Sequence, residues 1–439
     1  MIARAARVAL AAFAAALVFA APFASPPPKD RGQYRPAVKD PVLQELEEAN
    51  AAAEDAAAKV TDDLLAAQDQ EEKAREAARR DFRMDLSGLR RPRGPEDFPA
   101  RAWAFPPVAQ YLTGTCWSFA TTSFFESEIK RLSGREVKLS ELWSVYHEYL
   151  DKARRHVATR GRSVFEEGSE SEAIPRLWKT YGVVPESAYP GVLAPDGRHN
   201  HARMMDELKA YFAYCEANNY WNEDQVLSAV RGILDKHLGR PPERFDYEGR
   251  TYTPQAFLKE VAALDVDAYA SFVSTSAHPF YTRCELDAED NWWRADTYVN
   301  LPLEEWYALL VRAAQAGSSV AIGGDTSEPG YDGWNKVAVV PTFDVAPGYL
   351  DQDAREMRMA EGSTTDDHGI HLVGYARRDG ADWFLIKDSA RAARKAPPEG
   401  WLFYRGDYVK LKMLSYMVHR DFARDVLAKV QGGDAGIPK

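Results

Sequence analysis

The segment "QYLTGTCWSFATTSFFESEIKRL" occupies residues 110–132 and joins a turn to an apolar, helix-like run. The apolar residues of this run recur at spacings of three to five, which predicts a helix closed by Gly134; they are Trp117, Ala120, Phe124, Ile129 and Leu132. A helix N-terminus stabilises an anion, so a cysteine there loses its proton more readily. Gly114 lets backbone amides approach a reacting group closely. The segment therefore predicts a nucleophilic Cys116, with a buried structural cysteine as the alternative.

Composition excludes several other kinds of protein. The chain has 439 residues, of which 45% are hydrophobic and 12% aromatic, and this is typical of a globular protein with two or three cooperating units. Its net charge of −11 argues against nucleic acid and against anionic membrane surfaces as partners. No Cys or His cluster has the spacing of a zinc site, so neither a metal nor a cofactor is expected.

The first 24 residues have the pattern of a secretory signal peptide. Arg4 and Arg7 precede an Ala-rich apolar run, which ends in small residues near Ser25. The run is short for a membrane-spanning helix, which needs about 20 apolar residues, although an uncleaved anchor is the alternative. We therefore expect a secreted or periplasmic protein with no membrane span after cleavage. Export permits disulfides, and the sequence leaves open whether Cys215 and Cys284 pair.

The rest of the chain divides into three parts. Residues 25–100 form a linker and a helical extension, in which the run 41–85 is rich in Ala and Glu and predicts a helix. This helix is either a solvated spacer or an inhibitory propeptide. Residues 101–300 have helical patterns with insertions, and turns and aromatic clusters fill 241–300. Residues 301–439 contain short β-branched or aromatic runs that predict strands, followed by a tail; the runs are "SSVAIGG", "KVAVVPTF", "HLVGYARR" and "DWFLIKDS". A helical half followed by a β half predicts an α+β fold with a cleft between the halves.

Several motifs resemble the papain-like cysteine peptidases. Gln110 followed by Cys116-Trp117 is similar to the active-site signature of that superfamily. The stretch "DDHGIHLVGYARRDGADWFLIKDSA" resembles the strand of the catalytic histidine, which would be His368. Further landmarks are "YGV" at 181–183 and "YP" at 189–190. Counting back from them aligns Gly168 and Ser169 with the segment that binds the substrate backbone.

The spacing narrows the resemblance to one branch. Cys116 and His368 are 252 positions apart, well beyond the roughly 130–150 of short papain-like enzymes. Insertions of this size are similar to those of the bleomycin-hydrolase/aminopeptidase C-like branch. The resemblance implies a two-lobed fold, with a helical lobe, a β-barrel-like lobe and an active-site cleft between them.

The resemblance also implies roles for individual residues. Cys116 would attack as a thiolate paired with His368, Gln110 would stabilise the oxyanion, and Asp388 would orient the histidine. Gly168, Ser169 and Trp117 would contribute to substrate binding. Asp388 replaces the usual asparagine, and Ala390 replaces the tryptophan that usually shields it.

The expected function is that of an exported cysteine peptidase, either an aminopeptidase or an endopeptidase, that forms an acyl-enzyme on peptide or protein substrates. The sequence leaves open whether the protein forms an oligomer. The departures at 388–390 motivate the alternative, a catalytically silent papain-fold protein that binds peptides or partners.

Overall fold

The computed structural model describes residues 25–430, so the predicted signal peptide lies outside the described residues. The chain divides into two compact units, Met1–Asp81 and Phe82–Lys439. The first contains helix α1 (Pro41–Ala78), whose N-cap Asp40 accepts a hydrogen bond from the backbone N–H of Val42 at 2.9 Å. The prediction of a helix here is confirmed, although it ends at Ala78 because the backbone is already extended at Arg79. None of the 38 described residues of α1 is buried.

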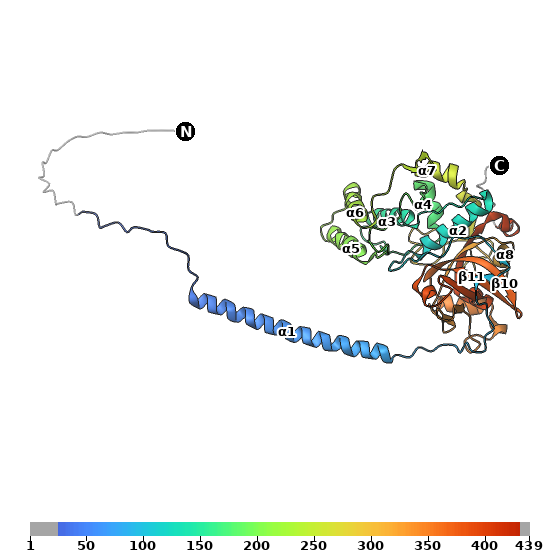
Figure 1. The fold of residues 1–439 in the computed structure, drawn as a ribbon, viewed down its shortest axis with the longest axis horizontal. Helices are drawn as coiled ribbons and strands as arrows, with labels where there is room; N and C mark the ends of the chain where they lie inside the picture. The colour runs from blue at the N-terminus through green and yellow to red at the C-terminus, as the bar shows by residue number, and fades with distance from the viewer. Residues whose placement is uncertain (1–24, 431–439) are drawn as a thin grey trace, which may run out of the picture. The chain divides into compact units, whose positions relative to one another are not determined.

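The first half of the second unit is helical. Its main helices are α2 (Cys116–Ser133), α3 (Glu141–Ala158), α4 (Ala173–Tyr181), α5 (Ala202–Ala217) and α6 (Glu223–Leu238). The predicted start of α2 and its closure by Gly134 are both confirmed, and Gly134 adopts the left-handed conformation (φ 75°) that favours glycine at this position. Residues 117–129 of α2 are all buried. Figure 1 shows these helices on one side of the unit and the strands on the other.

The second half is built on a large, mainly antiparallel sheet. Within the described residues this sheet has eleven strands in the order β5-β6-β4-β13-β7-β10-β11-β12-β9-β8, and β1 pairs with β10. The bounds are β1 (Ala100–Arg101), β4 (Tyr269–Val273), β5 (Arg283–Cys284), β6 (Tyr298–Asn300), β7 (Val320–Gly324), β8 (Tyr331–Asp332), β9 (Val337–Ala338), β10 (His368–Arg378), β11 (Ala381–Lys387), β12 (Trp401–Arg405) and β13 (Met413–His419).

Local chemistry sets the register of the central hairpin. Asp379 and Gly380 join β10 to β11, and both have positive φ (51° and 81°), as a two-residue hairpin turn with matching twist requires. On its other side β10 pairs with β7, which places His368 opposite Gly324. The predicted strands at β7, β10 and β11 are confirmed. The run at 336–343 forms a strand over only Val337–Ala338, and residues 269–300 supply three further strands of the sheet.

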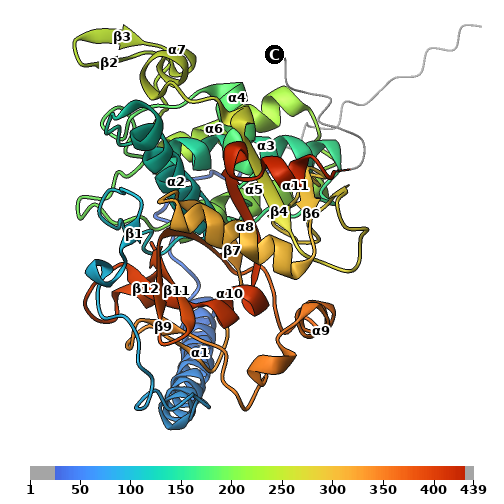
Figure 2. The same cartoon turned by 90° about the vertical axis from the view of Figure 1, so that its right-hand side faces the viewer.

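Further elements complete the unit. They are the two-stranded sheet β2 (Phe245–Tyr247) and β3 (Arg250–Tyr252), with helices α7 (Pro254–Phe257), α8 (Leu303–Gln315), α9 (Gln352–Ala360), α10 (Gly406–Lys412) and α11 (Arg424–Leu427). Figure 2 shows α8 and α10 alongside the sheet. Trp306 of α8 is fully buried in the core that this helix shares with β7, β10 and β11.

The two halves meet along α2. This helix contributes Trp117, Phe124 and Phe125 to a core that also takes in residues of α3–α6 and of the sheet. The α+β class predicted from the sequence is thus the class observed. In the part of the chain that the structure describes, no helix is both long and apolar enough to cross a bilayer.

Candidate active site

Cys116 is the first residue of α2, where backbone N–H groups have no partner within the helix. Its Sγ accepts a hydrogen bond from the backbone N–H of Gly369 at 3.5 Å. Gly369 packs so closely on this turn that a Cβ there would lie 3.1 Å from the Cα of Trp117. Absence of a side chain at 369 therefore brings the start of β10 against the thiol.

His368 lies between the thiol and a buried carboxylate. Its Nε2 is 2.8 Å from Oδ1 of Asp388, and the two side chains are 9% and 0% exposed. Burial opposes a charge on His368, but the charges of Asp388 and Cys116, together with hydrogen bonds to both, hold its pKa well above the ordinary value. Burial likewise opposes ionisation of Asp388, yet the His368 charge lowers the pKa of this carboxyl. The pair is therefore poised as imidazolium and carboxylate.

Asp388 makes a second contact that fixes its orientation. Its Oδ1 also accepts from the backbone N–H of Ala390 at 2.7 Å, and its own N–H donates to the carbonyl of Gly400. Its Oδ2 is buried and, among the described residues, has no hydrogen-bond partner. Asp388 thus occupies the position at which the sequence predicted a group that orients His368.

Gln110 links the turn before α2 to the segment after Asp388. Its backbone N–H donates to the carbonyl of Ser389 at 3.1 Å, and its Oε1 accepts from the hydroxyl of Ser389 at 2.7 Å. Its Nε2 donates to the carbonyl of Thr113 at 2.7 Å, which uses one of two N–H bonds. The structure therefore brings together four predicted site residues, which are Gln110, Cys116, His368 and Asp388.

The other three predicted site residues support a loop beside this group. Trp117 is 1% exposed, and its indole N–H donates to the carbonyl of Glu167 at 3.1 Å. Gly168 is close to Asp290, because a Cβ at 168 would lie 2.0 Å from the Oδ2 of that residue. Ser169 is buried and its hydroxyl donates to Glu148 at 2.6 Å. Gly168 is half-buried in this loop beside Asp290, whereas the hydrogen bonds of Trp117 and Ser169 hold the loop in place.

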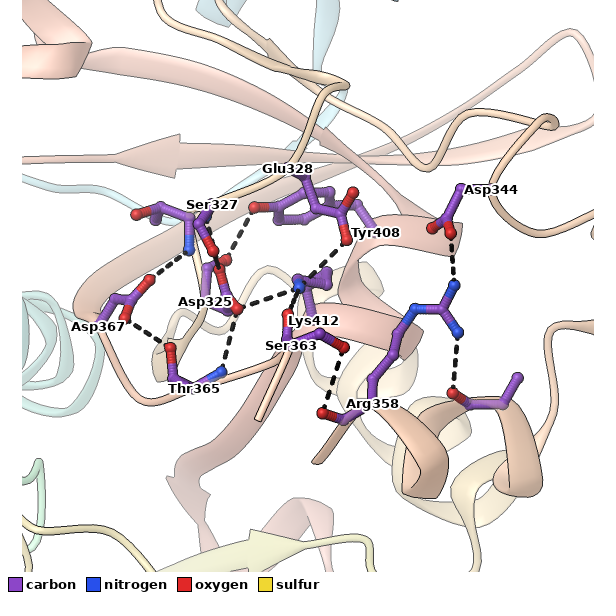
Figure 3. Close-up of polar contacts among 12 residues, drawn as sticks. Asp325, Ser327, Glu328, Asp344, Arg358, Ser363, Thr365, Asp367, Tyr408 and Lys412 are labelled. Carbon is purple, nitrogen blue, oxygen red and sulfur yellow. Dashed lines mark hydrogen bonds and ion pairs between the residues drawn. The ribbon is translucent and has the colours of Figure 1, made fainter. Parts of the chain in front are cut away.

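A buried lysine that the sequence did not indicate holds the loop that precedes His368. Lys412, at the end of α10, forms ion pairs with Asp325 (3.0 Å) and Glu328 (3.1 Å) and donates to the carbonyl of Ser363 at 2.6 Å (Figure 3). Asp325 also accepts from the backbone N–H of Thr365 at 3.0 Å. The loop that leads to His368 is thus tied to Lys412 through side chains, and no sequence spacing signals this connection.

A second buried group lies behind the site. The ammonium of Lys387 donates to the hydroxyl of Ser123 at 2.7 Å, and this hydroxyl is 2.9 Å from Nδ1 of His371. Burial lowers the pKa of Lys387 to about 8, and burial with the Lys387 charge lowers the pKa of His371 well below its ordinary value. This group is fully enclosed, so His371 is a packed histidine. Cys215 and Cys284 are free and buried.

Comparison with known proteins places this geometry in a family. The Peptidase C1-like family matches residues 104–381, a range that contains Gln110, Cys116 and His368 and ends before Asp388. Aminopeptidase C of Streptococcus thermophilus is 22% identical over 262 residues, which cover 50% of this chain and 58% of that protein. Aminopeptidase W of Lactobacillus delbrueckii subsp. lactis is 22% identical over 321 residues, which cover 60% of this chain and 70% of that protein. This chain therefore spans little more than half of the length of the first of these relatives.

A solved structure agrees in fold. The crystal structure of PepW from Lactobacillus rhamnosis superposes with a TM-score of 0.61 at 17% identity, over 75% of this chain and 84% of that one. This likeness supports the papain-like α+β fold predicted from the sequence. The predicted resemblance to the aminopeptidase C-like branch is confirmed by the same relatives. Because the matched residues make up more than half of its length, the chain belongs to the Peptidase C1-like family.

Proposed function

We propose that this protein is an exported cysteine peptidase that removes residues from the amino termini of peptides through a Cys116–His368 pair. The observation that carries the proposal is the position of His368 between Asp388 and Cys116, with its pKa held well above the ordinary value by both charges against the effect of burial. The thiolate is the nucleophile in this chemistry, and an imidazolium with this support is the counter-charge that it requires.

Acylation follows from the positions of four groups. The thiolate of Cys116 attacks the substrate carbonyl carbon, and the negative charge that develops on the oxygen is stabilised by the second N–H of the Gln110 side-chain amide and the backbone N–H of Cys116. Since Nε2 of His368 is bonded to Asp388, Nδ1 serves the thiol side. The imidazolium gives its Nδ1 proton to the leaving amine, the C–N bond breaks, and a thioester remains on Cys116.

Deacylation reverses the proton transfer. Neutral His368 takes a proton from water at Nδ1, and the resulting hydroxide attacks the thioester carbon. The C–S bond breaks, the acid product leaves, and Cys116 and His368 regain their charges. Asp388 retains its hydrogen bond to Nε2 throughout, so the ring stays in one orientation.

Two further parts of the proposal have separate support. Aminopeptidase action is supported by the names of the relatives, aminopeptidases C and W. Export is supported by the signal-like pattern of residues 1–24. Mass spectrometry of the protein recovered outside the cytoplasm tests export, and a mature amino terminus between residues 20 and 26 is the expected result.

The activity is tested with aminocoumarin amides that carry a free or an acetylated amino group. We expect faster hydrolysis of the free amines and a loss of at least about 10³-fold in Cys116→Ala and His368→Ala. Equal hydrolysis of both substrate forms would contradict aminopeptidase action and leave peptidase action in place.

The alternative of a silent binding protein is tested in the same preparation. Alkylation of Cys116 by iodoacetamide should be rapid near pH 6 in the wild type and slow in His368→Ala. Slow alkylation in both proteins, with no hydrolysis, would overturn the peptidase proposal. The substitution at position 388 gives no support to the silent protein, because Asp388 still makes the orienting hydrogen bond to His368.

A further inference from the structure

A cavity of about 670 Å³ lies near the start of β10. Its walls come from residues 273–278, residues 285–290 and residues 355–366, with Leu414. Asp366 lies in the wall, two positions before His368; burial raises the pKa of this carboxyl, and the His368 charge opposes the rise. The cavity therefore lies next to the segment that carries His368, and it has the size of a site for a long side chain or a small molecule.

The cavity wall is strongly acidic. Six carboxylates line it, namely Glu285, Asp287, Glu289, Asp290, Glu356 and Asp366. Arg355 is the lining residue with a permanent positive charge, but it is buried and its guanidinium donates to the backbone carbonyls of Ser274, Lys410, Met413 and Leu414. Arg355 is thus committed to the protein backbone and is not available to an anionic ligand.

Some of the six carboxylates already have partners and some do not. Glu285 pairs with Arg294 at 2.8 Å, and Glu356 accepts from Thr275 and Ser276. Within residues 25–430 no Lys, Arg or His lies within 4.0 Å of the carboxylates of the remaining four, which are Asp287, Glu289, Asp290 and Asp366. The cation that acts on Asp290 is Lys152, whose ammonium is itself bonded to the carbonyls of Glu166 and Gly168.

One buried polar atom in the cavity wall lacks a hydrogen-bond partner among the described residues, and this observation does not depend on the charges. Thr364 lines the cavity, is 4% exposed, and its Oγ1 has no hydrogen-bond partner among the described residues. Glu170, also 4% exposed, lies outside the cavity lining, and its carboxyl interacts with that of Asp366. Buried hydroxyls are normally hydrogen-bonded, so Thr364 points to a polar group that a ligand brings.

Burial and mutual repulsion favour the protonated forms of the carboxyls in and behind the cavity wall. Burial and the Asp366 charge raise the pKa of Glu170 well above its ordinary value, and the charges of Asp290 and Cys116 add to this rise. Burial also raises the pKa of Asp290 to about 6, helped by the Asp366 charge. A bound cation would lower all of these values and so is favoured.

The arrangement suits an organic cation better than a metal ion. In the described part of the chain no three His, Cys, Asp or Glu side chains converge on a point where a metal could be held. The carboxylates instead surround a volume large enough for an alkyl chain with a charged end. Asp290 also lies against Gly168, so a cation held there is next to the loop that contains Gly168.

We propose that this cavity recognises a cationic group of the peptide substrate, an ammonium or guanidinium, through Asp290 and Asp366. The proposal rests on the proposed peptidase function and names its substrate class. Both the free amino terminus and a Lys or Arg side chain supply this chemistry. The wild type should therefore prefer substrates with at least one of these cations near the bond that is cleaved.

Four coumarin amides separate the two sources of charge. They are those of lysine and of norleucine, each with a free or an acetylated amino group. Loss of the Lys-over-norleucine preference in Asp290→Asn identifies a side-chain site, and loss of the free-over-acetylated preference identifies an amino-terminal site. In either case we expect kcat/KM for the cationic substrate to fall at least about tenfold more than for acetyl-norleucine, which is typical of one charged hydrogen bond.

Asp353→Asn is the matched control, because Asp353 is an exposed acid of α9 that does not line the cavity. It should leave both preferences as they are in the wild type. Equal rates for all four substrates in the wild type would overturn the proposal and leave the peptidase function intact. A uniform loss of activity on all four in Asp290→Asn, with the preferences kept, would also overturn it.

Binding to the Cys116→Ala protein separates this inference from the peptidase function. Calorimetric titration near pH 6 with lysinamide should show binding with proton release, weaker in Asp290→Asn, and acetyl-norleucinamide should bind more weakly still. If the Cys116→Ala protein shows this binding but the wild type hydrolyses none of the substrates, the cation site stands and the peptidase proposal is refuted. Equal binding of both compounds would refute the cation site.

Discussion

Oδ1 of Asp388 lies 2.8 Å from Nε2 of His368, and the carboxylate has no exposure to solvent. The hydrogen bond orients the ring, and the negative charge raises the pKa of the imidazole although burial opposes this. A neutral amide would supply the first effect without the second. Asp in place of the usual Asn therefore affects the pH range of the proposed activity more than it affects the geometry of the site.

Asp388→Asn should shift the alkaline limit of activity to lower pH. The amide oxygen can still accept from Nε2–H, so the ring keeps its orientation, but the imidazolium loses a buried counter-charge. Removal of such a charge typically changes a pKa by about 1–3 units. The profile of kcat/KM against pH should therefore begin its alkaline fall about 1–3 units earlier. An alkaline limit that does not move would mean that the Asp388 charge is unimportant for the pair.

Gln110→Ala should lower kcat by about 10²–10³-fold, which is the usual loss when one oxyanion donor is removed. Its side chain also accepts a hydrogen bond from Ser389 at 2.7 Å, so the variant loses a structural contact as well. Ser389→Ala removes that contact alone and is the control, for which we expect a smaller loss of kcat. Equal losses in the two variants would assign Gln110 a structural role only.

The sequence predicted those parts of the molecule that depend on neighbours along the chain. The apolar spacing and Gly134 predict α2, and the Asp379–Gly380 turn accompanies the β10–β11 hairpin. Cys116 and His368 were found through local motifs, each of which is complete within a few residues. Most of the predicted strand at 336–343 is irregular, because the length of a strand depends on the partner strand that pairs with it in the sheet.

Parts that depend on distant pairing escaped the sequence analysis. Lys412 pairs with Asp325, which is 87 positions earlier in the sequence, and the residues around Lys412 resemble any short amphipathic stretch. Asp290 and Asp366 line one cavity only because the 285–290 loop and the end of the 355–366 segment fold together. Residues 269–300 enter the sheet through pairing with β13, a strand formed more than a hundred residues later. No spacing rule connects these segments before the fold is known.

Lys412→Met should lower the free energy of unfolding by about 3–5 kcal/mol, because it leaves Asp325 and Glu328 buried without their cation. The measurement is urea denaturation near pH 7. Lys410→Met is a matched control on the same helix, since Lys410 pairs with the largely exposed Glu304 and its loss should cost less than about 1 kcal/mol. Similar losses in both variants would contradict a special role for the buried group.

The same substitution should also change the acid stability of the protein. Burial opposes ionisation of Asp325, but hydrogen bonds from Ser327 and the Lys412 charge bring its pKa below the ordinary value in the folded state. A carboxyl with a lowered folded pKa stabilises the fold above its unfolded pKa of about 3.9, and this contribution disappears as the pH falls through the folded pKa. Without Lys412 the folded pKa rises, so Lys412→Met should unfold at a higher pH than the wild type in an acid titration.

The preference for a cationic substrate should increase as the pH rises through about 6. Burial raises the pKa of Asp290 to about 6, the charges of Asp366, Glu289 and Glu148 act in the same direction, and Lys152 opposes them. Below this pH Asp290 is protonated and cannot pair with a cation. The ratio of kcat/KM for a cationic and an uncharged substrate cancels the ionisation of the catalytic pair, so this ratio should rise about tenfold between pH 5 and 7. A ratio that stays flat in the wild type, or keeps rising in Asp290→Asn, would exclude Asp290 as the titrating group.

Deletion of residues 25–81 tests the two interpretations of α1. None of its described residues is buried, so the deletion exposes no apolar core and should leave the melting temperature of the remaining unit unchanged. The truncated chain should begin at Phe82, because Phe82 packs on Phe343 (ring centroids 5.2 Å apart) and Arg83 donates to the carbonyl of Tyr331. A solvated spacer predicts the same kcat/KM in both proteins. An increase of tenfold or more on deletion, reversed when the 41–78 peptide is added back, would instead identify α1 as an inhibitory segment.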